Sequence, residues 1–88
     1  MKRNESFIMK NVGGENLLIP VGSKVLDMNG LITLNETASY VWDLLSEEKT
    51  VGDLANAVAI KFNIDNEIAL HDVKCFLNEI ESLSLLEQ

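Results

Sequence analysis

The fold is decided at residues 31–45, where the sequence reads LITLNETASYVWDLL. The first four residues follow the turn pair Asn29-Gly30 and are aliphatic or β-branched, which predicts a short strand. From Asn35 the hydrophobic spacing changes from every second residue to one face of a helix. Asn35 suits the N-cap because its side-chain oxygen accepts a hydrogen bond from a first-turn amide. The apolar face of this helix consists of Leu34, Ala38, Val41, Trp42 and Leu45.

The residues before this stretch read as short strands that alternate with turns. Residues 13–16 and 27–30 are turn clusters with glycines, which adopt a positive φ at little cost. Pro20 is expected to end a strand because it donates no ladder hydrogen bond. Strands this close in sequence join as antiparallel hairpins. Apolar runs stand at residues 7–12, 17–19, 24–26 and 31–34, and three short strands are expected from them.

Two further helices follow, and both have recognisable boundaries. Thr50 and Asp53 have the spacing of a capping box, and Asn63 is a plausible helix end. The third helix is expected from residue 65 or 66 to about residue 83, with a central stripe of Ala69, Val73, Phe76, Ile80 and Leu83. The pattern predicts one α+β domain over residues 1–88, with an N-terminal three-stranded antiparallel sheet followed by three helices in a winged helix-turn-helix-like arrangement.

Composition narrows the class of function. The chain has 88 residues, with 7 Lys+Arg against 14 Asp+Glu and a net charge of −7, which disfavours nucleic acid as a partner. Cys75 is the single cysteine and has no internal disulfide partner, which indicates a reducing compartment. No run approaches the roughly 18 apolar residues of a membrane span, and the start lacks the apolar run of a signal peptide. A cytoplasmic domain without a membrane partner is therefore expected.

Residues that carry catalysis or bind metal are sparse in this sequence. His71 and Cys75 are four residues apart on one helix, but two ligands do not make a structural zinc site, which takes four. A solvated histidine and a half-buried helix cysteine are the more ordinary interpretation. Gly13-Gly14 precedes no helix, so it is not a phosphate-binding loop. We expect no catalytic activity, no cofactor and no metal site.

Residues 30–45 resemble the signature of the PqqD family, in which an apolar strand ending in Leu-Asn leads into an aliphatic-Trp-x-Leu-Leu helix. Further matches are Thr50-Val51, residues 72–77 and the terminal Leu85-Leu86, so the resemblance covers about residues 7–86. Ser84 stands where the family commonly has a glycine. This departure favours a relative that serves a peptide other than the precursor of pyrroloquinoline quinone.

The resemblance implies a non-catalytic chaperone for ribosomally made, post-translationally modified peptides. Such a protein binds the leader segment of a precursor peptide and presents it to a modifying enzyme, often a radical S-adenosylmethionine protein. In the family, the leader lies as an extra strand beside the third strand, in a cleft walled by the third helix. A monomer or weak dimer is expected.

The strand Leu31, Ile32, Thr33 and Leu34 is the candidate sheet edge for such a guest. It is short and carries neither proline nor charge, so it lacks the features that usually block pairing at an edge. If Ile32 and Leu34 point into the core, Leu31 and Thr33 face the other way. The alternative is that the C-terminal tail or a dimer partner covers this edge.

The third helix is the candidate wall of the cleft. Its apolar residues cover a wider arc than one core contact needs. Asp72 and Glu79 would then lie on the rim and select a basic leader residue. The alternative is that Ile68 packs under the preceding turn and Cys75 is merely tolerated. The predicted wall residues are Ile68, Asp72, Cys75, Phe76 and Glu79.

Two other classes of function fit the same fold. A winged-helix transcriptional regulator requires a basic recognition helix, whereas the second helix has only Lys61 and the third only Lys74. A self-associating scaffold module would pair the open edge with a second copy of itself.

Overall fold

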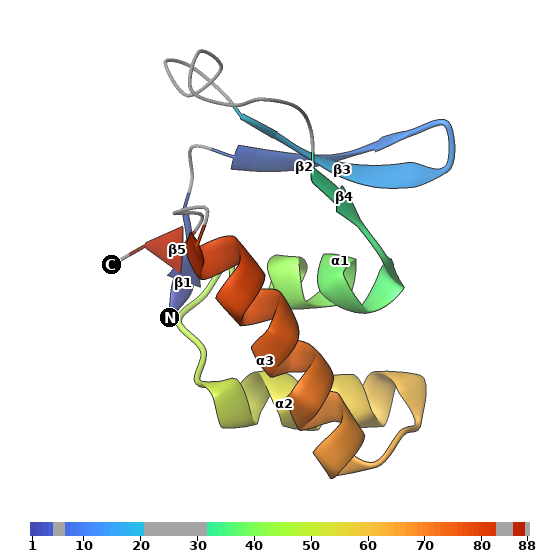
Figure 1. Ribbon diagram of the computed structural model, residues 1–88, viewed down its shortest axis with the longest axis vertical. Coiled ribbons are helices and arrows are strands. Elements are labelled where there is room, and N and C mark those ends of the chain that lie inside the picture. Colours follow the sequence, from blue (N-terminus) through green and yellow to red (C-terminus); the bar gives the residue numbers. More distant parts are fainter. Residues whose placement is uncertain (5–6, 21–31, 83–85, 88) are drawn as a thin grey trace.

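The computed structural model has a small antiparallel sheet lying over three helices (Figure 1). It describes residues 1–4, 7–20, 32–82, 86 and 87. The predicted strand 24–26, the turn 27–30 and Leu31 lie outside the described residues. The elements are β1 (Lys2–Arg3), β2 (Phe7–Val12), β3 (Glu15–Pro20), β4 (Ile32–Leu34), α1 (Glu36–Leu44), α2 (Val51–Phe62), α3 (Asn66–Ser82) and β5 (Leu86–Glu87).

The three-stranded sheet has the order β2-β3-β4, and both pairings are antiparallel, which confirms the predicted α+β class. Val12 lies opposite Glu15, so the β2–β3 turn contains only Gly13 and Gly14. Their φ angles of 60° and 87° are of the kind that two-residue hairpin turns require. The expected four-residue turn at 13–16 was therefore too long: two glycines close the hairpin, and β3 begins two residues earlier than predicted.

A second sheet pairs the two ends of the described chain, which the sequence did not predict. Lys2 lies opposite Glu87 and Arg3 opposite Leu86. β1 also bonds to the α1–α2 connection, since Arg3 N donates to Leu45 O at 2.9 Å. Because β5 pairs with β1, this part of the C-terminal tail does not cover β4.

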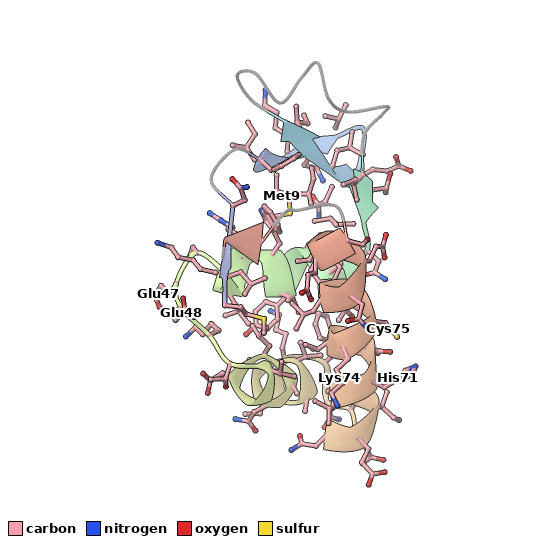
Figure 2. The ribbon with its side chains drawn as sticks, turned by 60° about the vertical axis from the view of Figure 1, so that its left-hand side comes forward. Met9, Glu47, Glu48, His71, Lys74 and Cys75 are labelled. Carbon is pink, nitrogen blue, oxygen red and sulfur yellow. The ribbon has the colours of Figure 1, made fainter. Side chains whose placement is uncertain are left out.

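The core forms where the sheet meets the helices, and Trp42 of α1 lies at its centre. Its side chain is fully buried, as are Leu18 from β3 and Leu54 from α2. Met9 of β2 packs against this core from the inner side of the sheet (Figure 2). The predicted apolar face of the first helix is confirmed, because all its members are buried: Leu34, Ala38, Val41, Trp42 and Leu45.

The helix ends follow the predicted capping chemistry. Asn35 Oδ1 accepts a hydrogen bond from Ala38 N at 2.8 Å. Thr50 and Asp53 form the reciprocal capping box, with both hydrogen bonds at 3.1 Å. Asn63 ends α2 in the left-handed conformation with φ 53°. These caps set the boundaries of α1 and α2 within a residue or two of their predicted positions.

A chain of side-chain hydrogen bonds ties the sheet to α1. Asn11 Nδ2 donates to Asn16 Oδ1 at 3.0 Å, and Asn16 Nδ2 donates to Ser39 Oγ at 2.9 Å. Ser39 Oγ in turn donates to the Asn35 carbonyl at 2.8 Å, and Ser39 is buried. Since Asn16 lies opposite Leu34 in the sheet, these bonds fix the corner at which β4 passes into α1.

We expect Ser39→Ala to lower the free energy of unfolding by about 1 kcal/mol. Losing the buried hydrogen bonds costs roughly 1–2 kcal/mol, which outweighs the helix preference of alanine at about 0.5 kcal/mol. Urea denaturation measures the change. Ser46→Ala is the control, because Ser46 is exposed and should change stability by less than about 0.5 kcal/mol. Equal effects of the two substitutions would contradict a structural role for the hydrogen bonds of Ser39.

We expect the stability of the fold to decline in acid partly through Asp53. The backbone N–H of Thr50, and secondly its side chain, hold the pKa of Asp53 below its usual 3.8. Because the pKa is lower in the folded state, the ionised carboxylate stabilises the fold. This stabilisation is complete when the pH is above the unfolded-state pKa, and it is lost as the pH falls through the folded-state pKa. Asp53→Asn should thus be less stable than the parent at neutral pH, with a difference that shrinks between about pH 5 and about pH 2. A difference that stays constant in urea titrations across this range would contradict the assignment.

Candidate functional site

The edge strand β4 presents one side that no described strand occupies. Its described neighbour is β3, with Thr33 opposite Leu17 and Ile32 opposite Leu18. Leu34 is buried and Ile32 is partly buried against the core, whereas Thr33 is exposed. The side chains of β4 thus alternate as the sequence predicted, and its unoccupied side borders the space in front of α3.

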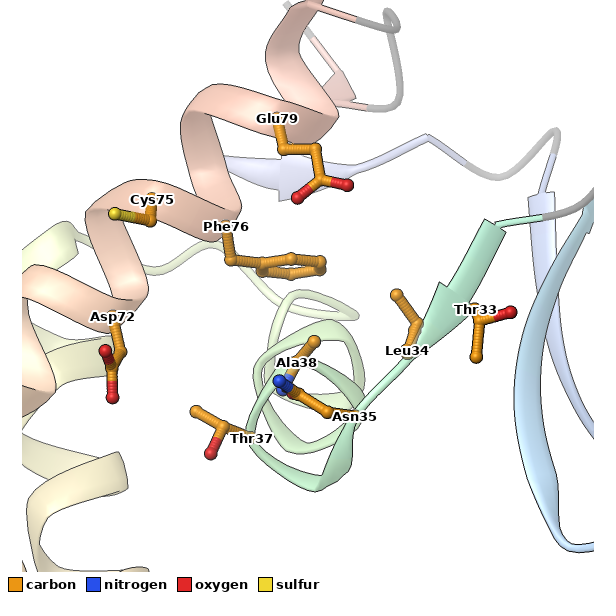
Figure 3. Close-up of a pocket in the computed structure, with 9 residues that line it drawn as sticks. All are labelled: Thr33, Leu34, Asn35, Thr37, Ala38, Asp72, Cys75, Phe76 and Glu79. Atoms are coloured by element: carbon orange, nitrogen blue, oxygen red, sulfur yellow. The ribbon is translucent and has the colours of Figure 1, made fainter.

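A pocket of about 290 Å³ lies between this strand, the start of α1 and one side of α3 (Figure 3). The strand and the helix form two of its walls, and the first turn of α1 forms a third. Its lining residues are Thr33, Leu34, Asn35, Thr37, Ala38, Asp72, Cys75, Phe76 and Glu79.

Phe76 provides the apolar surface of the α3 wall. Its ring projects from α3 toward β4, and Asp72 and Glu79 lie one helical turn to either side of it (Figure 3). Phe76 is only partly buried, so one part of the ring packs against the core and another part faces the pocket. The helix repeat explains this arrangement, because positions three and four residues apart share a face.

Cys75 lines the pocket, but its thiol points outward. Its sulfur is directed away from β4 (Figure 3) and lies 3.7 Å from His71 Nε2, one turn earlier on α3. Both side chains are exposed and lie on the solvent side of the helix (Figure 2). The pair is a local contact along one helix and does not point toward β4.

The predicted site residues divide into three groups. Ile32 and Ile68 do not line the pocket: Ile32 faces the core, and Ile68 is 53% exposed one turn before Asp72. Leu31 lies outside the described residues. The pocket brings together the others, namely Thr33, Leu34, Asp72, Cys75, Phe76 and Glu79. Their assignment to peptide binding stays a prediction.

Three lining residues were missed by the sequence analysis, and all belong to the first turn of α1. Asn35 was read as a cap and Ala38 as a core position, which they also are, whereas Thr37 was given no role. A signal was present: a helix that starts directly after an edge strand brings its first turn beside the end of that strand. Spacing alone did not show that α3 approaches the same corner.

The charge of the lining residues is negative. Asp72 and Glu79 are carboxylates, and none of the nine lining residues is a lysine or arginine. The ion pairs within the described part of the chain lie elsewhere, between the Met1 amino group and Glu48 and between Lys49 and Glu47. The pocket therefore combines the apolar ring of Phe76 with two carboxylates that have no cationic partner among the described residues.

The described residues contain no group of three or more His, Cys, Asp and Glu side chains placed to hold a metal ion. They also include no helix with the length and apolar character needed to cross a bilayer. What the arrangement offers is a row of backbone hydrogen-bonding groups beside an apolar ring. Such a surface suits an extended chain better than a compact polar ligand.

Comparison with known proteins gives two matches. The sequence model of a family described as Coenzyme PQQ synthesis protein D (PqqD) matches residues 18–86. The solved structure of TbiB1 in complex with the TbiA(beta) leader peptide is similar in fold, with a TM-score of 0.76 and 22% sequence identity. That similarity covers 99% of this chain and 95% of TbiB1. No curated protein sequence gives a significant match.

Proposed function

This chain belongs to the PqqD family, and from that premise we propose that it is a non-catalytic chaperone for a ribosomal precursor peptide. It binds the leader segment of the precursor as an added strand beside β4, with α3 as the opposite wall. The observation that carries the proposal is the side of β4 that no described strand occupies, which borders a pocket containing the ring of Phe76. TbiB1, which has the same fold, was solved in complex with a leader peptide.

Strand addition explains how so small a pocket holds a peptide. The backbone of an edge strand supplies hydrogen bonds to any extended chain, and the side-chain pockets beside it supply selectivity. Phe76 offers an apolar contact for one guest side chain, while Thr33 and Leu34 supply the edge. A flexible leader loses conformational freedom when it binds, so the net affinity is lower than the contacts alone would give.

The chaperone role includes a second partner, a modifying enzyme of the radical S-adenosylmethionine type. Support for this partner is the family alone. A guest held only along β4 leaves the remainder of the precursor free to extend into another active site. The protein acts as a monomer or weak dimer in this proposal, because pairing of two β4 edges would occupy the position that the guest requires.

We expect Thr33→Arg to weaken peptide binding roughly tenfold or more. Thr33 is exposed on the edge strand and lines the pocket, so a bulky charged side chain at this position would obstruct the guest. The probe is a fluorescent peptide selected from a displayed random library by the parent protein, and anisotropy measures its affinity.

Asn56→Arg is the matched control for this measurement. It makes the same change in charge on an exposed position of α2 that does not line the pocket, so its affinity should equal that of the parent. If Thr33→Arg also binds like the parent while remaining folded, the guest does not use this pocket.

We further expect the selected peptide to slow hydrogen exchange at β4. Guest pairing would place the outward-facing backbone amides of Ile32–Leu34 in new hydrogen bonds, which protect them from exchange. β2 is the internal control, because it forms the other edge of the same described sheet. Protection at β2 without protection at β4 would contradict the proposed binding edge.

A further inference from the structure

The two carboxylates of the pocket occupy defined positions relative to the ring of Phe76. Asp72 lies four residues before Phe76 and Glu79 lies three residues after it, on the same side of α3. At a rise of about 1.5 Å per residue, these offsets along the helix are roughly 6 Å and 4.5 Å. The ring of Phe76 therefore has a carboxylate on each side of it along α3, at distances that the helix repeat sets.

An extended guest has side chains that match this spacing. Side chains on one face of a strand recur every second residue, roughly 6.8 Å apart. For a guest strand that runs alongside the axis of α3, a side chain over Phe76 has same-face neighbours about one carboxylate spacing away in each direction. The long flexible stems of lysine and arginine readily cover the remaining difference of roughly 2 Å.

Within the described residues, no lysine or arginine forms an ion pair with Asp72 or Glu79. Lys74 is on α3, but two residues after Asp72 it points roughly 200° around the helix. Lys61 of α2 lies over the ring of Tyr40, at 5.7 Å from the ring centroid. A cation supplied by a guest would therefore meet Asp72 and Glu79 without competition from the described lysines.

We propose that the guest segment carries an apolar residue that packs on Phe76 and a lysine or arginine two positions away on one or both sides. This inference rests on the proposed function and adds the chemical class of the guest. The pocket and the open edge make the site, and the two carboxylates set its preference among peptides. The net charge of −7 acts in the same direction by attracting a basic segment before contact.

Selection from a displayed library of random 12-residue peptides tests the proposal. Peptides enriched by the full chain should carry lysine or arginine two positions from an aliphatic or aromatic residue. Asp72→Lys combined with Glu79→Lys should shift the enrichment to aspartate and glutamate at the same spacing. Both positions are exposed, so the double variant should retain the fold, which circular dichroism verifies.

The matched control combines Asp43→Lys with Glu81→Lys. It changes the net charge by the same amount at two exposed positions that do not line the pocket. This control should still enrich basic peptides. The proposal is overturned if the control shifts like the pocket variant, or if the parent enriches neutral or acidic peptides. Failure of all three proteins to enrich any peptide would instead contradict peptide binding itself.

Affinity measurements give the size of the effect. Replacing the lysine of an enriched peptide by glutamine should weaken binding roughly twofold to fivefold, as expected for an exposed ion pair. The loss should shrink in about 1 M NaCl, where the screening length is roughly 3 Å. With Asp72→Asn combined with Glu79→Gln, the lysine and glutamine peptides should bind equally. A lysine preference that persists in this double variant would overturn the role of the two carboxylates.

Discussion

The corner at Asn35 is the constraint on which the site depends. Asn35 directly follows the last residue of β4 and caps α1, so no loop separates the strand from the helix. Ser39 and Asn16 hold this corner by hydrogen bonds, and the buried Leu34 anchors it from inside. The edge strand is therefore fixed beside α3, and the pocket between them is preformed by the fold. A preformed edge lowers the ordering cost on the protein side when an extended chain binds.

The elements that the sequence predicted best are those with local signals. The N-cap at Asn35, the capping box at Thr50 and the left-handed end at Asn63 each depend on a few neighbouring residues. The helical faces depend on a repeat that is visible within four turns. The two-residue strands β1 and β5 have no such signal, because each exists only by pairing with the other end of the chain.

The sequence predicts those parts of the site that lie on a single helix or strand. Asp72, Phe76 and Glu79 share one side of one helix, so the helix repeat alone groups them. Ile68 belongs to the same side but lies a turn beyond the pocket, and the repeat does not show where the opposing wall stops. The contribution of Thr37 depends on the angle between α1 and α3, which is a tertiary property. The local sequence pattern identified the edge strand and the helix side that form the pocket. Where these two surfaces meet depends on tertiary packing.

The pairing of β1 with β5 brings the two ends of the described chain side by side (Figure 1). Head-to-tail cyclisation of the domain would thus require only a short linker, and a circularly permuted chain could open instead at the tight turn of Gly13 and Gly14. Any polypeptide fused to either end would leave the domain from one place. The pairing therefore places both attachment points of a longer chain on one side of the domain.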